Sequence, residues 1–163
     1  MKPIVQAIAI LLTSSCVSFA QDQASQRFLA EAIEGHFSEI KLGELAQKNG
    51  QSGGVKTFGE TLQNDHGEAN KKAIELAKSL GVNSPSSPNE KQKAALEEMA
   101  RMSGPAFDRA FANRMIADHR KDIEVYEQAA KKQDAVGKYA TAVLPTLRNH
   151  LQRAQTLQKD VGP

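Results

Sequence analysis

The sequence is organised around the stretch Leu62-Gln63-Asn64-Asp65-His66-Gly67-Glu68-Ala69. Apolar residues at helical spacing flank it, so Asp65 and His66 interrupt the inward face of a long predicted helix near its middle. A second pair, Asp118-His119, interrupts another helix between Met115 and Ile123. Polar side chains at core positions cost free energy unless they are paired or bind a ligand. The two pairs therefore indicate a polar site inside a helical bundle.

The fold class follows from the residues around these pairs. Ala, Lys, Glu, Gln and Leu dominate, and no run of alternating β-branched residues predicts a strand, so we expect an all-α chain. Apolar residues at helical spacing between Gly- and Pro-rich turns predict helices over residues 25–47, 55–80, 89–102, 105–132 and 135–159. Short turns within each pair of long helices, joined by the short crossover helix, predict a ferritin-like antiparallel four-helix bundle.

The N-terminus has the features of a secretory signal peptide. Met1-Lys2 precedes an apolar run that ends at Phe19, and Ser18-Phe19-Ala20 is a small-x-small cleavage site. We therefore expect residues 1–20 to be removed and residues 21–163 to form one bundle domain in the periplasm.

Two alternatives to a cleaved signal stay open. The apolar run could instead be a buried N-terminal helix, or Cys16 could carry a lipid that anchors the protein to a membrane. Cys16 is the only cysteine, so cleavage after Ala20 leaves a chain without disulfides, and the bundle has to rely on its apolar core.

The charge pattern argues against nucleic acid as a partner. The chain has 21 Lys and Arg residues and 19 Asp and Glu residues, in no long block of one sign, and only 5% of its residues are aromatic. No apolar run after residue 20 reaches membrane-spanning length. We expect a metal ion as a partner and no transmembrane segment in the mature chain, and the sequence identifies no protein partner.

The four histidines are predicted to lie at similar depths in the bundle. In an antiparallel hairpin, residues equally far from the turn lie at the same height, because each residue rises about 1.5 Å. His36 and His66 each lie 15 residues from position 51 in the first predicted turn. His119 and His150 lie 15 and 16 residues from position 134 in the second. The histidines of each hairpin should therefore be level and near mid-helix.

This layer is a candidate metal site. We expect His66, His119 and His150 as ligands, together with Glu39, which lies 12 residues from the first turn. Imidazole nitrogen and carboxylate oxygen bind zinc, copper, iron, nickel or manganese, and the residue types do not select one of these metals. His150 could instead be a core histidine that is satisfied by hydrogen bonds, and His66 and His119 could face the edge of the bundle with solvated aspartates beside them.

Three neighbouring residues have secondary roles in this interpretation. Asp65 and Asp118 each point about 100° away from the histidine that follows them. They are therefore expected to hydrogen-bond and orient a histidine of a neighbouring helix rather than to share its metal. His36 is an alternative ligand from the first helix, because its depth fits while its position on the helix face is less central.

Segments across most of the chain carry a family resemblance. They are Glu39 with Leu42-Gly43, Val55-Lys56-Thr57-Phe58, Asp65-His66, Gly104-Pro105-Ala106-Phe107-Asp108, His119, Tyr126-Glu127 and Leu144-Pro145-Thr146-Leu147-Arg148-Asn149-His150. Over residues 25–157 the chain resembles the exported bacterial family called domain of unknown function 4142. The resemblance implies a ferritin-like fold, an envelope location and a metal site at Glu39, His66, His119 and His150. Glu127 also matches and is a further candidate ligand, whereas His36 is outside the family pattern.

Two functions of different class remain open. The first is an exported metal-binding bundle that serves metal handling or the response to envelope stress. The second is a structural or interaction bundle whose inward His, Asp and Glu side chains form a hydrogen-bond network without metal. An enzyme has less support, because Gln63, Ile116 and Leu147 stand where di-iron carboxylate proteins have the Glu of Glu-x-x-His. No other catalytic motif is present.

Overall fold

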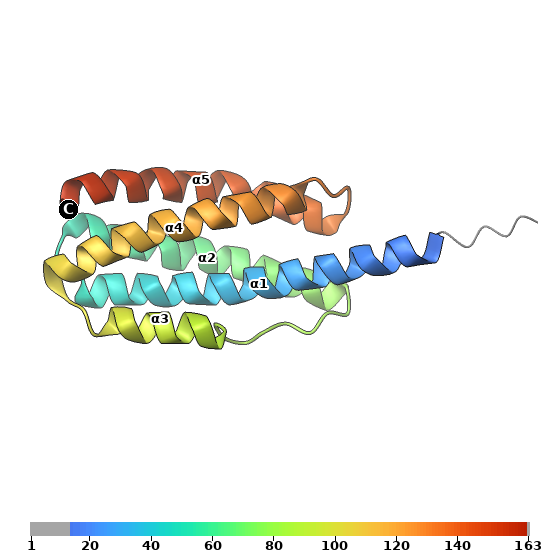
Figure 1. Cartoon of the computed structure of the whole chain (residues 1–163), viewed down its shortest axis with the longest axis horizontal. Coiled ribbons are helices and arrows are strands. Elements are labelled where there is room, and N and C mark those ends of the chain that lie inside the picture. The colour runs from blue at the N-terminus through green and yellow to red at the C-terminus, as the bar shows by residue number, and fades with distance from the viewer. Residues whose placement is uncertain (1–13, 163) are drawn as a thin grey trace, which may run out of the picture.

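The computed structural model describes the backbone of residues 14–162 and the side chains of residues 23–162. Over that range the chain forms five helices and no strand: α1 (Ser14–Asn49), α2 (Gly53–Ser79), α3 (Glu90–Ala100), α4 (Gly104–Ala130) and α5 (Ala135–Val161). The four long helices form an antiparallel bundle in which α1 pairs with α2 and α4 pairs with α5 (Figure 1). This is the all-α bundle that the sequence predicts.

Four of the five predicted helices agree with the structure to within two residues, and the first is longer than predicted. We expected it over residues 25–47, whereas α1 begins at Ser14 and its first turns extend beyond the other helices (Figure 1). The segment between Ser14 and Ser25 contains no Gly or Pro to stop the helix, and its Ala and Gln residues favour helical continuation. The side chains of the predicted signal peptide, including Cys16, lie outside the described residues, so export and lipidation stay predictions.

The turns at the ends of the hairpins are set by specific caps. The Ser52 side chain accepts a hydrogen bond from the backbone N–H of Val55 and caps α2, and Asp134 caps α5 by accepting from Gly137. The buried Asp108 of α4 accepts from the backbone N–H groups of Gln51 and Ser52 at 2.9 and 2.8 Å. Asp108 therefore joins the first turn to the second hairpin.

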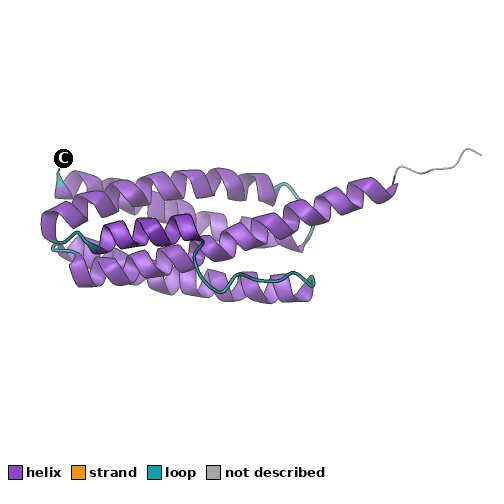
Figure 2. Cartoon of the chain, turned by 60° about the horizontal axis from the view of Figure 1, so that its bottom comes forward, coloured by secondary structure: helices purple, strands orange, loops and turns teal. Residues whose placement is uncertain are grey.

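The crossover helix α3 lies on the outside of the bundle, where Figure 2 shows it in front of the long helices and joined to α2 by a long loop. It starts with a capping box in which Asn89 and Gln92 bond to each other's backbone. Met99 is the one residue of α3 that is buried. The helix thus covers the bundle without contributing much to its core.

The core has two apolar parts, one on each side of the central histidines. One part includes Phe28, Leu29, Ile33, Tyr126, Tyr139 and Leu147, and the other includes Leu42, Phe58, Leu62, Phe107, Phe111 and Met115. The helices α1 and α2 pack most closely where Gly43 faces Gly59, since a Cβ atom on Gly43 would overlap the carbonyl oxygen of Gly59. Among the helices described, none combines the length and the apolar character that crossing a membrane requires.

Candidate metal centre

Three histidines from three helices meet in the middle of the bundle. They are His66 of α2, His119 of α4 and His150 of α5, and their side chains are 3%, 0% and 0% exposed. One ring nitrogen of each lies within 4.8 Å of the corresponding nitrogens of the other two. The ring centroids are 5.2 to 5.7 Å apart. The hairpin spacing in the sequence thus predicted the height of these three rings correctly.

The tautomer of His119 is set by the backbone of its own helix. His119 Nδ1 lies 2.9 Å from the carbonyl oxygen of Met115, one turn earlier. A carbonyl oxygen can only accept a hydrogen bond, so Nδ1 carries the proton. The other nitrogen, Nε2, therefore has a free lone pair, which points away from α4.

The tautomer of His150 is set by an aspartate of another helix. His150 Nε2 donates to Asp65 Oδ2 at 2.8 Å, so the lone pair of His150 is on Nδ1. Asp65 thus bonds to a histidine of a neighbouring helix, which is the position proposed for it from the sequence. Asp65 is 42% exposed, whereas the histidine that it holds is buried.

The free nitrogens of these two rings face each other. His119 Nε2 lies 3.2 Å from His150 Nδ1. Burial lowers the pKa of His119 to about 3, and burial also lowers the pKa of His150 although the Asp65 carboxylate opposes this effect. Both rings are therefore neutral near pH 7, and neither has a proton to donate across the contact.

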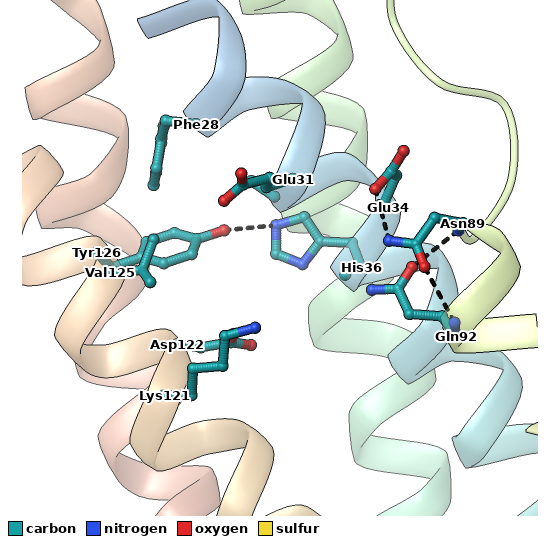
Figure 3. A pocket seen from close by; sticks show the side chains of 12 residues that line it. Phe28, Glu31, Glu34, His36, Asn89, Gln92, Lys121, Asp122, Val125 and Tyr126 are labelled. Carbon is teal, nitrogen blue, oxygen red and sulfur yellow. Dashed lines mark hydrogen bonds between the residues drawn. The ribbon is translucent and has the colours of Figure 1, made fainter. Parts of the chain in front are cut away.

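His36 lies behind His66 and fixes its orientation. The two Nδ1 atoms are 2.9 Å apart, so one ring donates to the other. On its far side, His36 Nε2 lies 2.7 Å from the hydroxyl of Tyr139. The same nitrogen lies 3.0 Å from the hydroxyl of Tyr126 (Figure 3). Burial lowers the pKa of His36 to about 4, which keeps this ring neutral as well.

The bond from Tyr139 to the carbonyl oxygen of Ala69 decides which atom donates and which accepts in each bond of this chain. Tyr139 donates its hydroxyl proton to the carbonyl oxygen of Ala69 at 3.2 Å, so its oxygen accepts from His36 Nε2–H. His36 Nδ1 then accepts from His66 Nδ1–H. The lone pair of His66 is therefore on Nε2, a buried atom without a hydrogen-bond partner among the described residues.

Glu39 lies in a different environment from the three histidines. Its side chain is 3% exposed, and its Oε2 atom has no hydrogen-bond partner in the described part of the chain. It lines a cavity between α1, α3 and α4, and its carboxylate does not join the three nitrogens. The distance from a turn predicts height but not direction around the helix, which is why the sequence placed Glu39 in the same layer.

Two other candidates also lie away from the three nitrogens. Asp118 forms an ion pair with Arg114 one turn earlier on α4 and has no bond to a histidine. Glu127 bonds to Arg148 at 2.8 Å with both side chains about half exposed. It lies about two turns beyond His119, roughly 12 Å along the helix. Glu127 is therefore a surface residue that lies away from the three nitrogens.

The sequence interpretation missed the hydroxyl groups of Tyr126 and Tyr139. Both residues are buried, and they are the only tyrosines in the chain. A buried tyrosine usually needs a partner for its hydroxyl, so two tyrosines at inward positions near four inward histidines were a usable signal. The roles of the carbonyl oxygens of Met115 and Ala69 could not be predicted in this way, because every residue has a backbone carbonyl oxygen.

Comparisons with known proteins agree with this fold. The chain is similar to a DUF305 fragment from Deinococcus radiodurans, with a TM-score of 0.75 and 12% identity over 84% of this chain and 96% of that one. It is also similar to a putative secreted DUF305 protein from Streptomyces coelicolor, with a TM-score of 0.73 and 10% identity over 86% and 95% of the two chains. A search of curated proteins found no match. The model of the family described as domain of unknown function DUF4142 matches residues 14–157, and the chain therefore belongs to that family.

Proposed function

We propose that this protein binds one transition-metal ion between α2, α4 and α5, through Nε2 of His66, Nε2 of His119 and Nδ1 of His150. The observation that carries the proposal is the 3.2 Å separation of His119 Nε2 and His150 Nδ1. Each of these nitrogens has its proton on the opposite side of its ring, so the contact places one lone pair against another. A cation held between them replaces this repulsion by two coordinate bonds.

The separation of the nitrogens fits a metal of ordinary size. Zinc binds histidine nitrogen at about 2.0–2.1 Å, and two ligands at the tetrahedral angle are then about 3.3 Å apart. The 3.2 Å contact is close to that value. One ring nitrogen of His66 also lies within 4.8 Å of a ring nitrogen of each of the other two histidines, so His66 is close enough to be the third ligand.

The donor atoms favour some metals over others. Three neutral imidazoles suit zinc or copper, and also iron or nickel, whereas manganese prefers oxygen ligands. The Asp65 carboxylate behind His150 forms the carboxylate–histidine pair that commonly supports a bound metal. We therefore infer zinc or copper as the resident ion.

A cavity reaches His66, one of the three proposed ligands. It has a volume of about 120 Å³ and lies between α2 and α5, where Asp65, His66, Tyr139 and Thr146 line it. Three protein ligands leave a fourth position of a tetrahedral ion open. We propose that a water molecule takes that position and that the metal enters past His66.

The role that we propose is metal handling in the bacterial envelope. The signal-peptide features of residues 1–20 support export, and one structural neighbour is described as a secreted protein. The open fourth position supports exchange of the metal with another carrier. A part in the response to metal stress in the envelope belongs to the same proposal.

Elemental analysis tests the proposal on protein made without a His-tag and isolated from the bacterial envelope. We expect about one zinc or copper ion per chain in the wild type and much less in His119→Ala. Metal-free wild-type protein that takes up none of the ions supplied would contradict the proposal.

One observation favours the alternative function, a bundle with a polar network and no metal. The bonds that connect His66 Nδ1, His36 and Tyr139 to the carbonyl oxygen of Ala69 form without an ion, although His66 Nε2 keeps no partner among the described residues. They leave the contact between His119 and His150 unexplained. If that alternative were correct, wild-type protein would have the same thermal stability with and without added zinc or copper.

A further inference from the structure

A second polar region lies between α1, α3 and α4, on the other side of the bundle from the cavity that reaches His66. Two adjoining cavities of about 440 and 390 Å³ share Gly35, Asn89, Gln92, Lys121 and Asp122 in their walls. The larger is also lined by Glu39, Arg114 and Asp118, and the smaller by Glu31 and Glu34. Acidic side chains outnumber basic ones around the combined cleft.

Glu39 is the unusual member of this region. Its carboxyl group is almost fully buried, points into the cleft rather than toward the three histidines, and leaves Oε2 without a partner in the described structure. A buried carboxylate normally has a cation or several hydrogen-bond donors beside it, because desolvation otherwise disfavours its charge. Among the described side chains, none donates a hydrogen bond to Oε2 of Glu39, and Arg114, which lines the same cavity, is paired with Asp118.

The acidic groups opposite Glu39 increase this imbalance. Burial, then Asp118, then Asp122 raise the pKa of Glu39 well above its usual value, and Arg114 opposes them only in part. Arg114 already pairs with Asp118. Burial, with a contribution from Asp118, also raises the pKa of Asp122 to about 6, although Lys121 opposes this effect. The structure thus contains two inward carboxyl groups, on α1 and α4, that form no ion pair within 4 Å among the described residues.

Lysine does not supply a positive partner for these carboxyl groups. Lys121 lines both cavities and Lys91 lines the larger one, yet neither forms an ion pair within 4 Å among the described residues. Figure 3 shows Lys121 and Asp122 on α4, at the edge of the cavity where His36 and Tyr126 meet. A small cation would therefore find carboxylate oxygens in the cleft that no side chain has neutralised.

We propose that the cleft is a second cation site, in which Glu39 and Asp122 hold a divalent ion that prefers oxygen ligands, with water completing its coordination. Magnesium-like and manganese-like ions are commonly bound by one or two carboxylates while they keep several water molecules. A cavity of about 440 Å³ has room for these waters. Asp118 adds negative potential from its place beside Arg114. This site is independent of the three-histidine centre, because it uses different residues and a different donor atom.

Manganese(II) alone is the probe for this site, and the electron paramagnetic resonance signal of free Mn²⁺ measures binding. We expect about one Mn²⁺ per chain in both the wild type and His119→Ala. Glu39→Gln keeps the shape of the side chain but removes its charge, and we expect it to weaken Mn²⁺ binding at least about tenfold. Glu44→Gln is the matched control, because Glu44 is an exposed carboxylate of α1 paired with Lys41, and it should bind Mn²⁺ as the wild type does.

The same titration can overturn the proposal. Wild-type protein that binds no Mn²⁺, or binding that Glu39→Gln leaves unchanged, would exclude this site. Loss of Mn²⁺ binding in His119→Ala would place the ion at the histidines instead. If Glu39→Gln did not fold, Asp122→Asn would take its place, with the same tenfold loss expected and unchanged binding counting against the proposal.

Discussion

His119 Nε2 and His150 Nδ1 lie 3.2 Å apart in the centre of the bundle, and each directs a lone pair at the other. The two rings belong to α4 and α5, and His66 approaches them from α2. An ion at this point therefore connects the second hairpin to the first. Since a ligand that binds only the folded state stabilises it, metal binding and the stability of the bundle should be coupled.

Asp65→Asn should weaken zinc affinity by about 10- to 100-fold, because Asp65 holds the ring of His150 through its Nε2–H. The matched control is Asp118→Asn. Asp118 also precedes a histidine in the sequence, but it bonds to Arg114 instead. Competition titration with a chromophoric chelator measures both variants. Equal zinc affinities in the two variants would show that Asp65 has no orienting role.

His36→Leu should weaken zinc binding about tenfold, because it removes the atom that accepts the Nδ1–H of His66 and thereby leaves that tautomer unsupported. His36→Gln offers an amide oxygen in place of the ring nitrogen and should recover part of the affinity. Nitrogen-15 NMR of the imidazoles gives a second readout, with His66 expected to be protonated at Nδ1 in the wild type. Protonation at Nε2 in the metal-loaded protein would contradict the direction of the chain of bonds.

Metal-free protein should lose stability as the pH falls below 6.5. Histidines titrate near 6.5 in the unfolded chain, whereas burial lowers the pKa of His36 to about 4 and that of His119 to about 3 in the folded protein. Between these values the unfolded state binds more protons, so each of the two histidines removes up to about 1.4 kcal/mol of stability per pH unit.

Protonation of Asp122 changes the stability in the opposite direction to protonation of the histidines, so a variant of Asp122 provides a control. Burial raises its pKa to about 6 in the folded protein, so it binds a proton there first and adds stability as the pH falls from about 6 toward 4. Urea denaturation of chelator-treated protein at several pH values should therefore show a steeper loss in Asp122→Asn than in the wild type. If the free energy of unfolding of Asp122→Asn did not change between pH 6.5 and pH 4, the conclusion that the buried histidines are neutral in the folded protein would be wrong.

Gly43→Ala should destabilise the bundle by about 1–3 kcal/mol, because its Cβ atom would meet the backbone oxygen of Gly59 and force α1 away from α2. Gly67→Ala is a control with the opposite sign. Gly67 is helical and has no atom within 4 Å of the added Cβ, so alanine should stabilise by about 0.5–1 kcal/mol. Thermal unfolding of both variants measures the difference, and a change of the same sign in both would show that the close approach is unimportant.

The height of the site could be predicted from the sequence, and the directions of its side chains only in part. Helical rise is constant, so counting from the turns was enough to bring His66, His119 and His150 to one level. Each residue also turns by about 100°, so a small error in helix phase decides whether Glu39 faces the histidines or α4. Because of this error, Glu39 was predicted to join the three nitrogens, whereas the structure keeps it apart from them. For the same reason His36 was predicted only as an alternative ligand, although it is the hydrogen-bonded neighbour of His66.

Other features depend on tertiary packing that one sequence does not reveal. Asp65 and Asp118 each precede an inward histidine, so the sequence predicted that one of them would bond to a histidine of the next helix. In the structure Asp65 bonds to His150. Asp118 had the same sequence context, yet Arg114 one turn earlier on the same helix provided a nearer partner. The first helix was predicted from residue 25, whereas α1 begins at Ser14, because no Gly or Pro stops the helix over that segment.

X-ray absorption at the zinc edge of reconstituted protein tests the three-histidine site most directly. We predict three imidazole nitrogens at about 2.0–2.1 Å in the wild type, with the imidazole count falling to two in His119→Ala. Zinc that is lost on gel filtration of the wild type, or zinc surrounded only by oxygen with no imidazole scattering, would contradict the account.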